Sequence, residues 1–178
     1  MSLHATIQEL RDLDRELKQS KKETEQMFRA TDRKLNKLIY SFEDQWGRLI
    51  ESLVEGGLVV LMKSRGIDVH RTSIRVTGDY KGKQYEFDII ANNGTEIVIV
   101  EVKSGLNVKK VKEFLEELSH VKIWLHEYKD YKVYGAVAFL KSNEESIKFA
   151  ERNGLFVIKA TGDSSRIINQ EDFIARVW

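Results

Sequence analysis

The sequence predicts an α/β domain, built on a mixed β-sheet flanked by helices, that follows a long N-terminal helix forming a coiled coil. Near the N-terminus, apolar side chains recur at alternating steps of three and four, without Gly or Pro. Beyond residue 45, strand-like and helical segments alternate, and the last two strands each follow a helix. Because helical crossovers join parallel strands, the sheet should be mixed. We therefore expect an arm over residues 1–45 and a domain over residues 46–178.

The arm carries the seam of a coiled coil. An alternation of four and three steps visits twelve positions, of which eight are apolar. These positions are Leu3, Ile7, Leu10, Asp14, Leu17, Lys21, Thr24, Phe28, Thr31, Leu35, Leu38 and Phe42. A helix of roughly 40 residues cannot bury such a stripe alone, so it needs a second copy or a segment of another protein. Self-association is commoner, and we predict a homodimer or higher homo-oligomer, in which the polar positions set the register or mark an imperfect seam.

The domain begins with a helix and a three-stranded meander. Residues 46–65 have helical periodicity, Gly66 is a suitable stop, and Gly56-Gly57 is a potential break. Strands are predicted over 69–77, 85–91 and 96–103. The remaining predicted elements are a helix from an Asn107 cap to about Tyr128, a strand over 131–140, a helix with a Ser142 and Glu145 capping box that ends at Gly154, and a strand over 155–160.

The composition limits the kinds of site. There is no Cys, and the four His residues lack metal-ligand spacing, so any metal should be held by oxygen. No run approaches the ~18 apolar residues of a membrane span, and the N-terminus is charged where a signal peptide would be apolar. We expect a cytoplasmic protein without membrane contact. A net charge of +1 gives no evidence for a polyanionic partner, so nucleic-acid binding would rest on local basic patches.

The central hairpin brings charged residues together. Asn93-Gly94 is the strongest two-residue turn signal in the sequence. If those two residues form the turn, Asn92 pairs with Thr95. In an antiparallel hairpin the numbers of opposed residues have a constant sum, so Glu86 pairs with Glu101. One sheet face then carries Glu86, Asp88, Glu101 and Lys103. Asp88 and Glu101 are then diagonal neighbours, whose backbones lie about 7 to 8 Å apart. Their two carboxylates can span this distance by binding one cation. A loop of odd length would instead place Asp88 on the opposite sheet face from Glu101.

These charges stand in an apolar setting. The strand around Glu101 is apolar on both faces, as in a central strand, and a lone buried carboxylate normally neutralises, pairs or binds metal. Two explanations remain open from chemistry alone. Asp88 and Glu101 converge on a cation beside Lys103, or Glu101 and Lys103 form a pair at a solvated strand end while Asp88 is merely polar near a turn.

A motif covers these residues. Asp88, a spacer of twelve residues, and then Glu101-Val102-Lys103 on an apolar strand resembles the signature of the PD-(D/E)XK nuclease superfamily. The predicted order of helix, three-stranded meander, helix and strand also resembles that family's core, over about residues 46–160. Phe87 stands where the family name places Pro, at a position that varies in the family. The resemblance implies a restriction-endonuclease-like fold, and the arm resembles the coiled-coil extensions of uncharacterised microbial members.

The resemblance also implies roles for individual residues. Asp88, Glu101 and the carbonyl of Val102 would ligate Mg²⁺ or Mn²⁺, which activates a water for in-line attack on a phosphate. Lys103 would stabilise the developing charge or orient that water. Glu51 is the fourth expected catalytic residue, because Gly47-Arg48-Leu49-Ile50-Glu51 resembles the family pattern in the first helix. The alternatives are that Glu55, one turn further on, takes this role or that both are solvated helix charges.

Other charged and aromatic residues admit two readings. Lys109, Lys110 and Lys112 would contact a nucleic-acid backbone or form a solvated helix face. Glu86 is a further acid of the site or a charge on its rim. Trp124 is expected in the core or at a helix cap rather than as a base-stacking platform.

Two functions follow as hypotheses. The first is a Mg²⁺-dependent nuclease that hydrolyses DNA, including branched or damaged DNA, as a coiled-coil dimer that pairs two centres to cut both strands. The second is a non-catalytic coiled-coil adaptor whose nuclease-like domain binds nucleic acid or a partner protein. Retention of Asp88, Glu101 and Lys103 favours the nuclease. RNA is a weaker substrate hypothesis, because no RNA-specific module is visible.

Overall fold

The chain forms two compact units, Met1–Asp44 and Gln45–Trp178. The computed structural model describes residues 3–161 and 163–178, without the side chains of residues 3–7, 9–10, 39–40 and 42–44. One helix, α1 (Leu3–Lys63), contributes to both units. No helix in the described part of the chain has the apolar stretch needed to cross a bilayer.

The arm is helical throughout its described length. Its described seam residues Leu17, Phe28, Leu35 and Leu38 are all exposed, whereas the side chains at seam positions 3, 7, 10 and 42 lie outside those described. The coiled coil therefore stays a prediction. In the second unit, the potential break at Gly56-Gly57 does not interrupt α1, since both residues are helical.

The domain contains the mixed sheet that the sequence predicts. Among the described residues, six strands lie in the order β1-β2-β3-β4-β5-β6. They are β1 (Arg71–Tyr80), β2 (Lys83–Asn92), β3 (Glu96–Leu106), β4 (Lys132–Ser142), β5 (Phe156–Ala160) and β6 (Ser165–Ile167). Strand β2 pairs antiparallel with both β1 and β3, the strands β3, β4 and β5 are parallel, and β6 pairs antiparallel with β5. The short β6 was not predicted.

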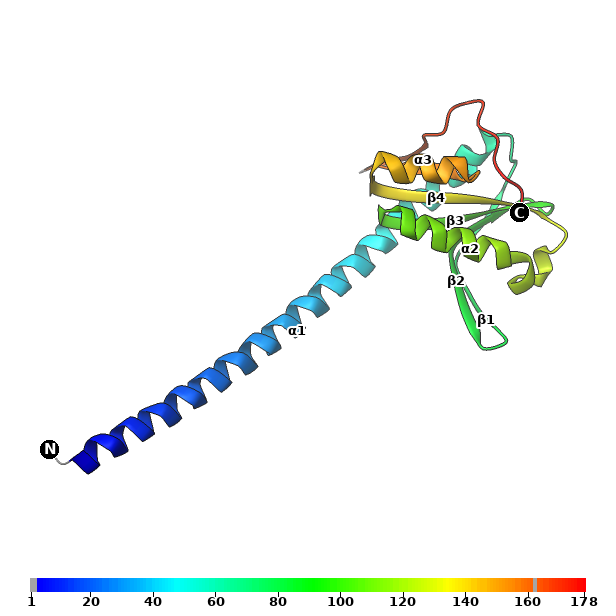
Figure 1. The fold of residues 1–178 in the computed structure, drawn as a ribbon. Helices are drawn as coiled ribbons and strands as arrows, with labels where there is room; N and C mark the ends of the chain where they lie inside the picture. The colour runs from blue at the N-terminus through cyan, green and yellow to red at the C-terminus, as the bar shows by residue number, and fades with distance from the viewer. Residues whose placement is uncertain (1–2, 162) are drawn as a thin grey trace. The chain divides into compact units, whose positions relative to one another are not determined.

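Helices cover both faces of the sheet (Figure 1). On one face, α1 buries Ile50, Val54, Leu58 and Met62, spaced by four residues along one helical stripe. The other face is covered by α2 (Val108–Trp124) and α3 (Glu144–Arg152), and η1 (His126–Tyr128) follows α2. Strands β3 and β4 are therefore buried on both sides, which explains their nearly continuous apolar sequences.

Asparagine side chains cap the two helices that follow strands. Asn107 caps α2, as predicted, by accepting a hydrogen bond from the N–H of Lys110 at 2.9 Å. The predicted cap of α3 is wrong by one residue, because Asn143 accepts from the N–H of Ser146. Ser142 is instead the last residue of β4, where its hydroxyl donates to Leu106 O at 3.4 Å. Helix α2 also ends at Trp124, before the predicted end near Tyr128.

Removing the α2 cap should destabilise the domain. Asn107→Ala leaves the N–H of Lys110 without its acceptor and is expected to cost about 1 kcal/mol of unfolding free energy. Urea unfolding followed by circular dichroism would measure the loss. Asn107→Ser is the matched control, because serine caps about as well. An equal loss in both variants would show that capping is not the cause.

Candidate active site

Strands β2 and β3 separate in the middle of the sheet. Their described pairing runs from Asn92–Ile97 to Ile89–Val100 and ends there, whereas β2 continues to pair with β1. Figure 1 shows the resulting β1–β2 hairpin extending past the other strands. Beyond the last pair, the N–H of Val102 donates to Asp88 Oδ2 at 2.7 Å. The Asp88 side chain thus bridges to β3 where the ladder stops.

The predicted register is wrong by two residues. Asn92 pairs with Ile97 rather than Thr95, so Glu86 does not oppose Glu101. The side chain of Asn93 explains the difference, since its Oδ1 accepts from the N–H groups of Thr95 and Glu96 at 3.0 and 2.8 Å and closes a wider loop. The shift is even, however, so the predicted convergence of the two acids survives.

Strand β2 also changes its alternation at the site. Phe87 and Ile90 both pack in the core layer beside α2, whereas Ile89 packs in the layer beside α1. Strict alternation would separate Phe87 from Ile90, so the pattern slips by one residue around Asp88. In β1, at the position that the register sets opposite Asp88, Arg75 has a φ of 52°, in the left-handed region that non-glycine residues seldom adopt. The hairpin is thus locally distorted at the acid.

An open polar groove lies where the strands part. Its volume is about 620 Å³. The groove is lined by Thr77, Gly78, Asp79, Gln84, Tyr85, Glu86, Asp88, Glu101, Lys103 and Glu117. The structure therefore brings together Asp88, Glu101 and Lys103, with the exposed Glu86 also on the lining. Val102 lies between Glu101 and Lys103 in β3. Its N–H donates to Asp88 of β2, and its carbonyl faces β2 as well, because the N–H and C=O of one strand residue point the same way.

The acids of the groove are electrostatically unfavourable together. Burial raises the pKa of Glu101 to about 7, and the nearby charge of Asp88 adds to the rise. Burial also raises the pKa of Asp88, and the Val102 hydrogen bond and the Lys103 charge offset this only in part. These two carboxylates would gain from a cation placed between them.

Lys103 is tied to the same cluster. Its Nζ forms an ion pair with Glu101 Oε1. Burial alone would lower the pKa of Lys103, but the Glu101 carboxylate together with the charges of Asp88 and Glu117 leaves it raised. The side chain therefore stays a protonated donor in the groove.

Glu117 of α2 is a groove residue that the sequence analysis missed. Burial raises its pKa, which the charge of Lys103 partly counteracts. A signal was available, because Glu117 follows Phe114 by three residues and precedes Leu118 by one, at the edge of the buried stripe of α2. Helix α2 directly follows β3, the strand that carries Glu101. A carboxylate at the edge of the buried stripe of α2 is therefore a candidate for the same site.

Glu51 lies outside the groove lining and pairs with a cation. Its carboxylate accepts from Nε and Nη2 of Arg75 at 3.0 and 3.4 Å. Its charge still contributes to the raised pKa of Asp88. The alternative acid, Glu55, accepts a hydrogen bond from the hydroxyl of Thr72. A catalytic role for Glu51 remains a prediction. In the structure, its carboxylate forms an ion pair with Arg75.

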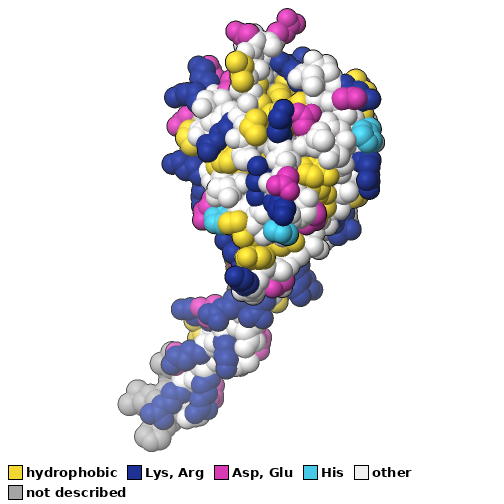
Figure 2. All heavy atoms as spheres, turned by 90° about the vertical axis from the view of Figure 1, so that its right-hand side faces the viewer, with side chains coloured by type: hydrophobic (Ala, Val, Ile, Leu, Met, Phe, Trp, Pro, Cys, Tyr) yellow, Lys and Arg dark blue, Asp and Glu magenta, His cyan; other side chains and the backbone are white. Residues whose placement is uncertain are grey.

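The three lysines at the start of α2 make local contacts. Lys110 Nζ donates to Gly105 O at 2.6 Å, Lys112 Nζ lies 5.7 Å from the centre of the Phe149 ring, and Lys109 lies 3.7 Å from a carboxylate one turn along α2. Figure 2 shows Lys and Arg interspersed with Asp and Glu on the drawn face of the domain, without one large basic patch. Nucleic-acid contact by these lysines stays a prediction.

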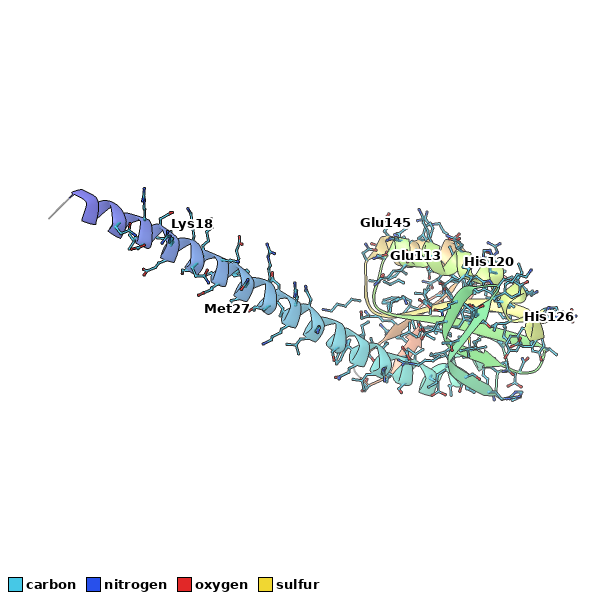
Figure 3. All side chains as sticks on the ribbon, turned by 90° about the horizontal axis from the view of Figure 1, so that it is seen from below. Lys18, Met27, Glu113, His120, His126 and Glu145 are labelled. Atoms are coloured by element: carbon cyan, nitrogen blue, oxygen red, sulfur yellow. The ribbon has the colours of Figure 1, made fainter. Side chains whose placement is uncertain are left out.

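Aromatic stacking holds the hairpin against α2. The Trp124 ring stacks on Tyr85 with centroids 5.6 Å apart and on His120 at 5.2 Å, while Lys83 Nζ lies 4.9 Å from its centre. Figure 3 labels His120 on α2, one turn before Trp124. Trp124 is buried, which confirms its prediction as a core residue. Because Tyr85 also lines the groove, this stack connects the groove wall to the core.

The oxygen atoms of the groove fit a hard divalent cation. Two carboxylates with raised pKa values and a backbone carbonyl turned to the same side are donors that Mg²⁺ and Mn²⁺ accept. Within residues 3–161 and 163–178, no group of three or more His, Cys, Asp or Glu side chains is arranged to hold a metal. The candidate donor set thus depends on the carbonyl of Val102 as well as on side chains.

The fold and groove define a mixed α/β domain with a polar, acid-rich site at its strand separation. The profile of the family described as "Domain of unknown function (DUF8196)" matches residues 55–167, more than half of the chain. The chain belongs to this family. No curated protein matches its sequence significantly.

Two solved structures show limited similarity to the chain. A protein of unknown function, AF1548, is 18% identical over 56% of this chain and 53% of its own, with a TM-score of 0.40. A repair endonuclease from Pyrococcus abyssi is 16% identical over 62% of this chain and 46% of its own, with a TM-score of 0.44. The chain thus spans about half the length of each of these two structures.

Proposed function

We propose that the domain is a metal-dependent nuclease of the PD-(D/E)XK superfamily, with a restriction-endonuclease-like fold, that hydrolyses DNA phosphodiester bonds. The observation that carries the proposal is the convergence of Asp88, Glu101 and Lys103 on one open groove where β2 and β3 part. Two acids and one amine are the groups needed to hold a cation and stabilise a phosphate under attack. Branched or damaged DNA is included among the proposed substrates.

The metal would be held by Asp88, Glu101 and the carbonyl of Val102. When bound, Mg²⁺ or Mn²⁺ supplies a Lewis acid that polarises the scissile phosphate and makes a coordinated water more acidic. The N–H of Val102 fixes one oxygen of Asp88 and so limits its rotation. The Glu101 side chain is largely buried beside Asp88, so its carboxylate has little contact with water to lose when a metal binds.

Lys103 is the proposed catalytic cation of the chain itself. The Glu101 carboxylate holds its ammonium group in the groove and keeps it protonated. A protonated amine can donate a hydrogen bond to a phosphate oxygen and stabilise the negative charge that develops there. Anchored by its stacked aromatic residues, the hairpin supplies the opposite wall that positions the substrate strand.

A cleavage assay tests the proposal. Purified full-length protein would be incubated with linear, supercoiled and four-way-junction DNA in Mg²⁺, Mn²⁺ or EDTA, beside Asp88→Asn. We expect cleavage with either metal, none in EDTA, and loss of cleavage in the variant. Binding without cleavage in every condition would refute catalysis and favour the adaptor hypothesis. Equal cleavage by Asp88→Asn would show that another site acts.

Thermal stability should depend on pH through Glu101. Its folded pKa of about 7 exceeds the ordinary value of 4.5, so between these values the folded protein keeps a proton that the unfolded chain has released. Without metal, stability is therefore expected to fall as pH rises from about 4.5 to about 7. Mg²⁺ should stabilise the protein more at about pH 8 than at about pH 5, because the ion competes with protons.

Thermal unfolding across this pH range, in EDTA and in Mg²⁺, measures both effects. Glu101→Gln should reduce the pH dependence, leaving the part due to the raised pKa values of Asp88 and Glu117, and should remove the stabilisation by Mg²⁺. Glu116→Gln, at an exposed position on α2, is the control and should retain both. A Mg²⁺ effect of equal size at both ends of the range would contradict a site built on carboxylates of raised pKa.

We further propose that the arm is a coiled coil that joins copies of the chain. The exposed apolar stripe of α1 supports this proposal, since such a stripe is poorly placed in water. Sedimentation at several protein concentrations would test it, and a species that is monomeric at all of them would refute it.

A further inference from the structure

The polar positions of the arm carry information about how two copies align. Leu17 and Phe28 are 67% and 70% exposed and line a shallow groove on α1 together with Lys21 and Thr24. In a parallel, in-register pair every seam residue meets itself. Lys21 would then face a second Lys21, and Asp14 a second Asp14, which places like charges inside the seam.

An antiparallel pair removes this conflict. When opposed residue numbers sum to 45, Leu17 meets Phe28 of the second copy, while Lys21 meets Thr24. The other layers are Asp14 with Thr31, Leu10 with Leu35, Ile7 with Leu38 and Leu3 with Phe42, in which positions 3, 7, 10 and 42 are paired from the sequence alone. Every apolar position meets an apolar one, and the four polar positions meet one another.

Neighbouring antiparallel registers lack this segregation. A shift of one heptad to a sum of 52 sets Asp14 opposite Leu38 and Thr24 opposite Phe28. The opposite shift, to a sum of 38, sets Lys21 opposite Leu17. Each alternative therefore buries polar groups against apolar ones, at a cost that the first register avoids.

The charges that flank the seam select the same register. In antiparallel coiled coils, equivalent flanking positions of the two helices approach one another, and on the flank that carries residues 11, 18, 25 and 32 the opposed residue numbers sum to 43. Lys18 then meets Glu25, and Arg11 meets Asp32, each with opposite charge. In the register whose seam numbers sum to 52, Glu25 would face Glu25 of the second copy. In the register whose seam numbers sum to 38, Lys18 would face Lys18 of the second copy. Figure 3 shows Lys18 and Met27, which occupy opposite flanks of the seam, projecting from opposite sides of α1.

We infer that the arm pairs with a second copy of itself in antiparallel orientation, with Leu17 opposite Phe28. The inference rests on the proposed self-association and adds its direction and register. Paired positions run from residue 3 to residue 42, so the seam fills the first unit, Met1–Asp44, and ends where the second begins. The two domains attach to opposite ends of a paired segment about 60 Å long at 1.5 Å per residue. This arrangement differs from the expected pairing of two centres on one cleavage position.

Charge reversal tests the flanking pairs in the full chain. Glu25→Lys sets a lysine against Lys18 of the second copy at two symmetric places and should weaken dimerisation about tenfold or more. The double variant Lys18→Glu with Glu25→Lys should restore most of the wild-type affinity. Lys18→Glu alone also loses an exposed pair with Asp14 at 2.6 Å, so Glu25→Lys is the cleaner single variant. Glu16→Lys is the matched control, on the outward face of the helix, and should dimerise like wild type.

Sedimentation equilibrium separates the possible outcomes. Rescue by the double variant supports the antiparallel register. A dimer that Glu25→Lys does not weaken, or that the double variant does not rescue, refutes the register while self-association stands. A wild type that stays monomeric refutes self-association and this inference, without affecting the nuclease proposal.

Cysteine cross-linking gives an independent test, because the natural chain has no Cys. Under mild oxidation, mixed Leu17→Cys and Phe28→Cys proteins should form a disulfide between the two kinds of chain. Neither variant alone should cross-link, since the two copies of residue 28 lie about 16 Å apart along an antiparallel pair, beyond disulfide reach. Efficient cross-linking of Phe28→Cys alone would show a parallel pair and overturn the inference.

Discussion

Lys103→Ala is expected to lower the rate of DNA cleavage by about 100-fold to 1000-fold, the loss that follows removal of one donor to a transition-state anion. Lys103 is the cation paired with Glu101 in the groove, where it is partly shielded from water. Alanine removes both the charge and the donor. Single-turnover cleavage with protein in excess would measure the chemical step free of product release.

A matched lysine separates catalysis from general loss of positive charge. Lys109 lies at the start of α2 with its side chain 85% exposed, so Lys109→Ala should change the rate only a few-fold. Both variants should still be stabilised by Mg²⁺, because the proposed metal donors remain in place. If Lys103→Ala cuts at the wild-type rate, or if Lys109→Ala is equally impaired, the assigned role of Lys103 is wrong.

The convergence of Asp88 and Glu101 could be predicted from sequence because it depends on parity. A turn of any even length keeps both residues on one side of the hairpin, so the error of two residues did no harm. The exact loop length could not be predicted, because it is set by the side chain of Asn93 accepting two backbone hydrogen bonds. Local hydrogen bonding of this kind competes with the simple two-residue turn.

The contribution of α2 to the groove was harder to predict for a different reason. Periodicity identifies which side of a helix is buried, but the rotation and tilt of the helix on the sheet decide which border residue reaches a given strand end. Glu117 lies on such a border. The same limit applies to Glu51, whose sequence pattern suggested a catalytic acid and whose side chain pairs with Arg75.

The helical periodicity of residues 46–65 is confirmed, whereas the buried stripe that fixes how this helix packs on the sheet is defined only by the structure. Ile50, Val54, Leu58 and Met62 recur every four residues and all face the sheet. The core that they close also contains Ile89 and Val100, the last described pair before β2 and β3 part. The position of the groove therefore depends on packing on the opposite face of the sheet.

Leu58→Ala is accordingly expected to destabilise the domain by about 2 to 5 kcal/mol, through lost burial and the cavity left behind. Leu58 is fully buried, at 0% exposure, whereas Leu49 on the same helix is 62% exposed. Leu49→Ala makes the same chemical change and should cost no more than about 0.5 kcal/mol. Urea unfolding of both variants measures the difference, and equal losses would contradict the packing of α1 on the sheet. Because Ile89 and Val100 share this core with Leu58, DNA cleavage by Leu58→Ala should disappear at a lower urea concentration than cleavage by the wild type, together with loss of the fold.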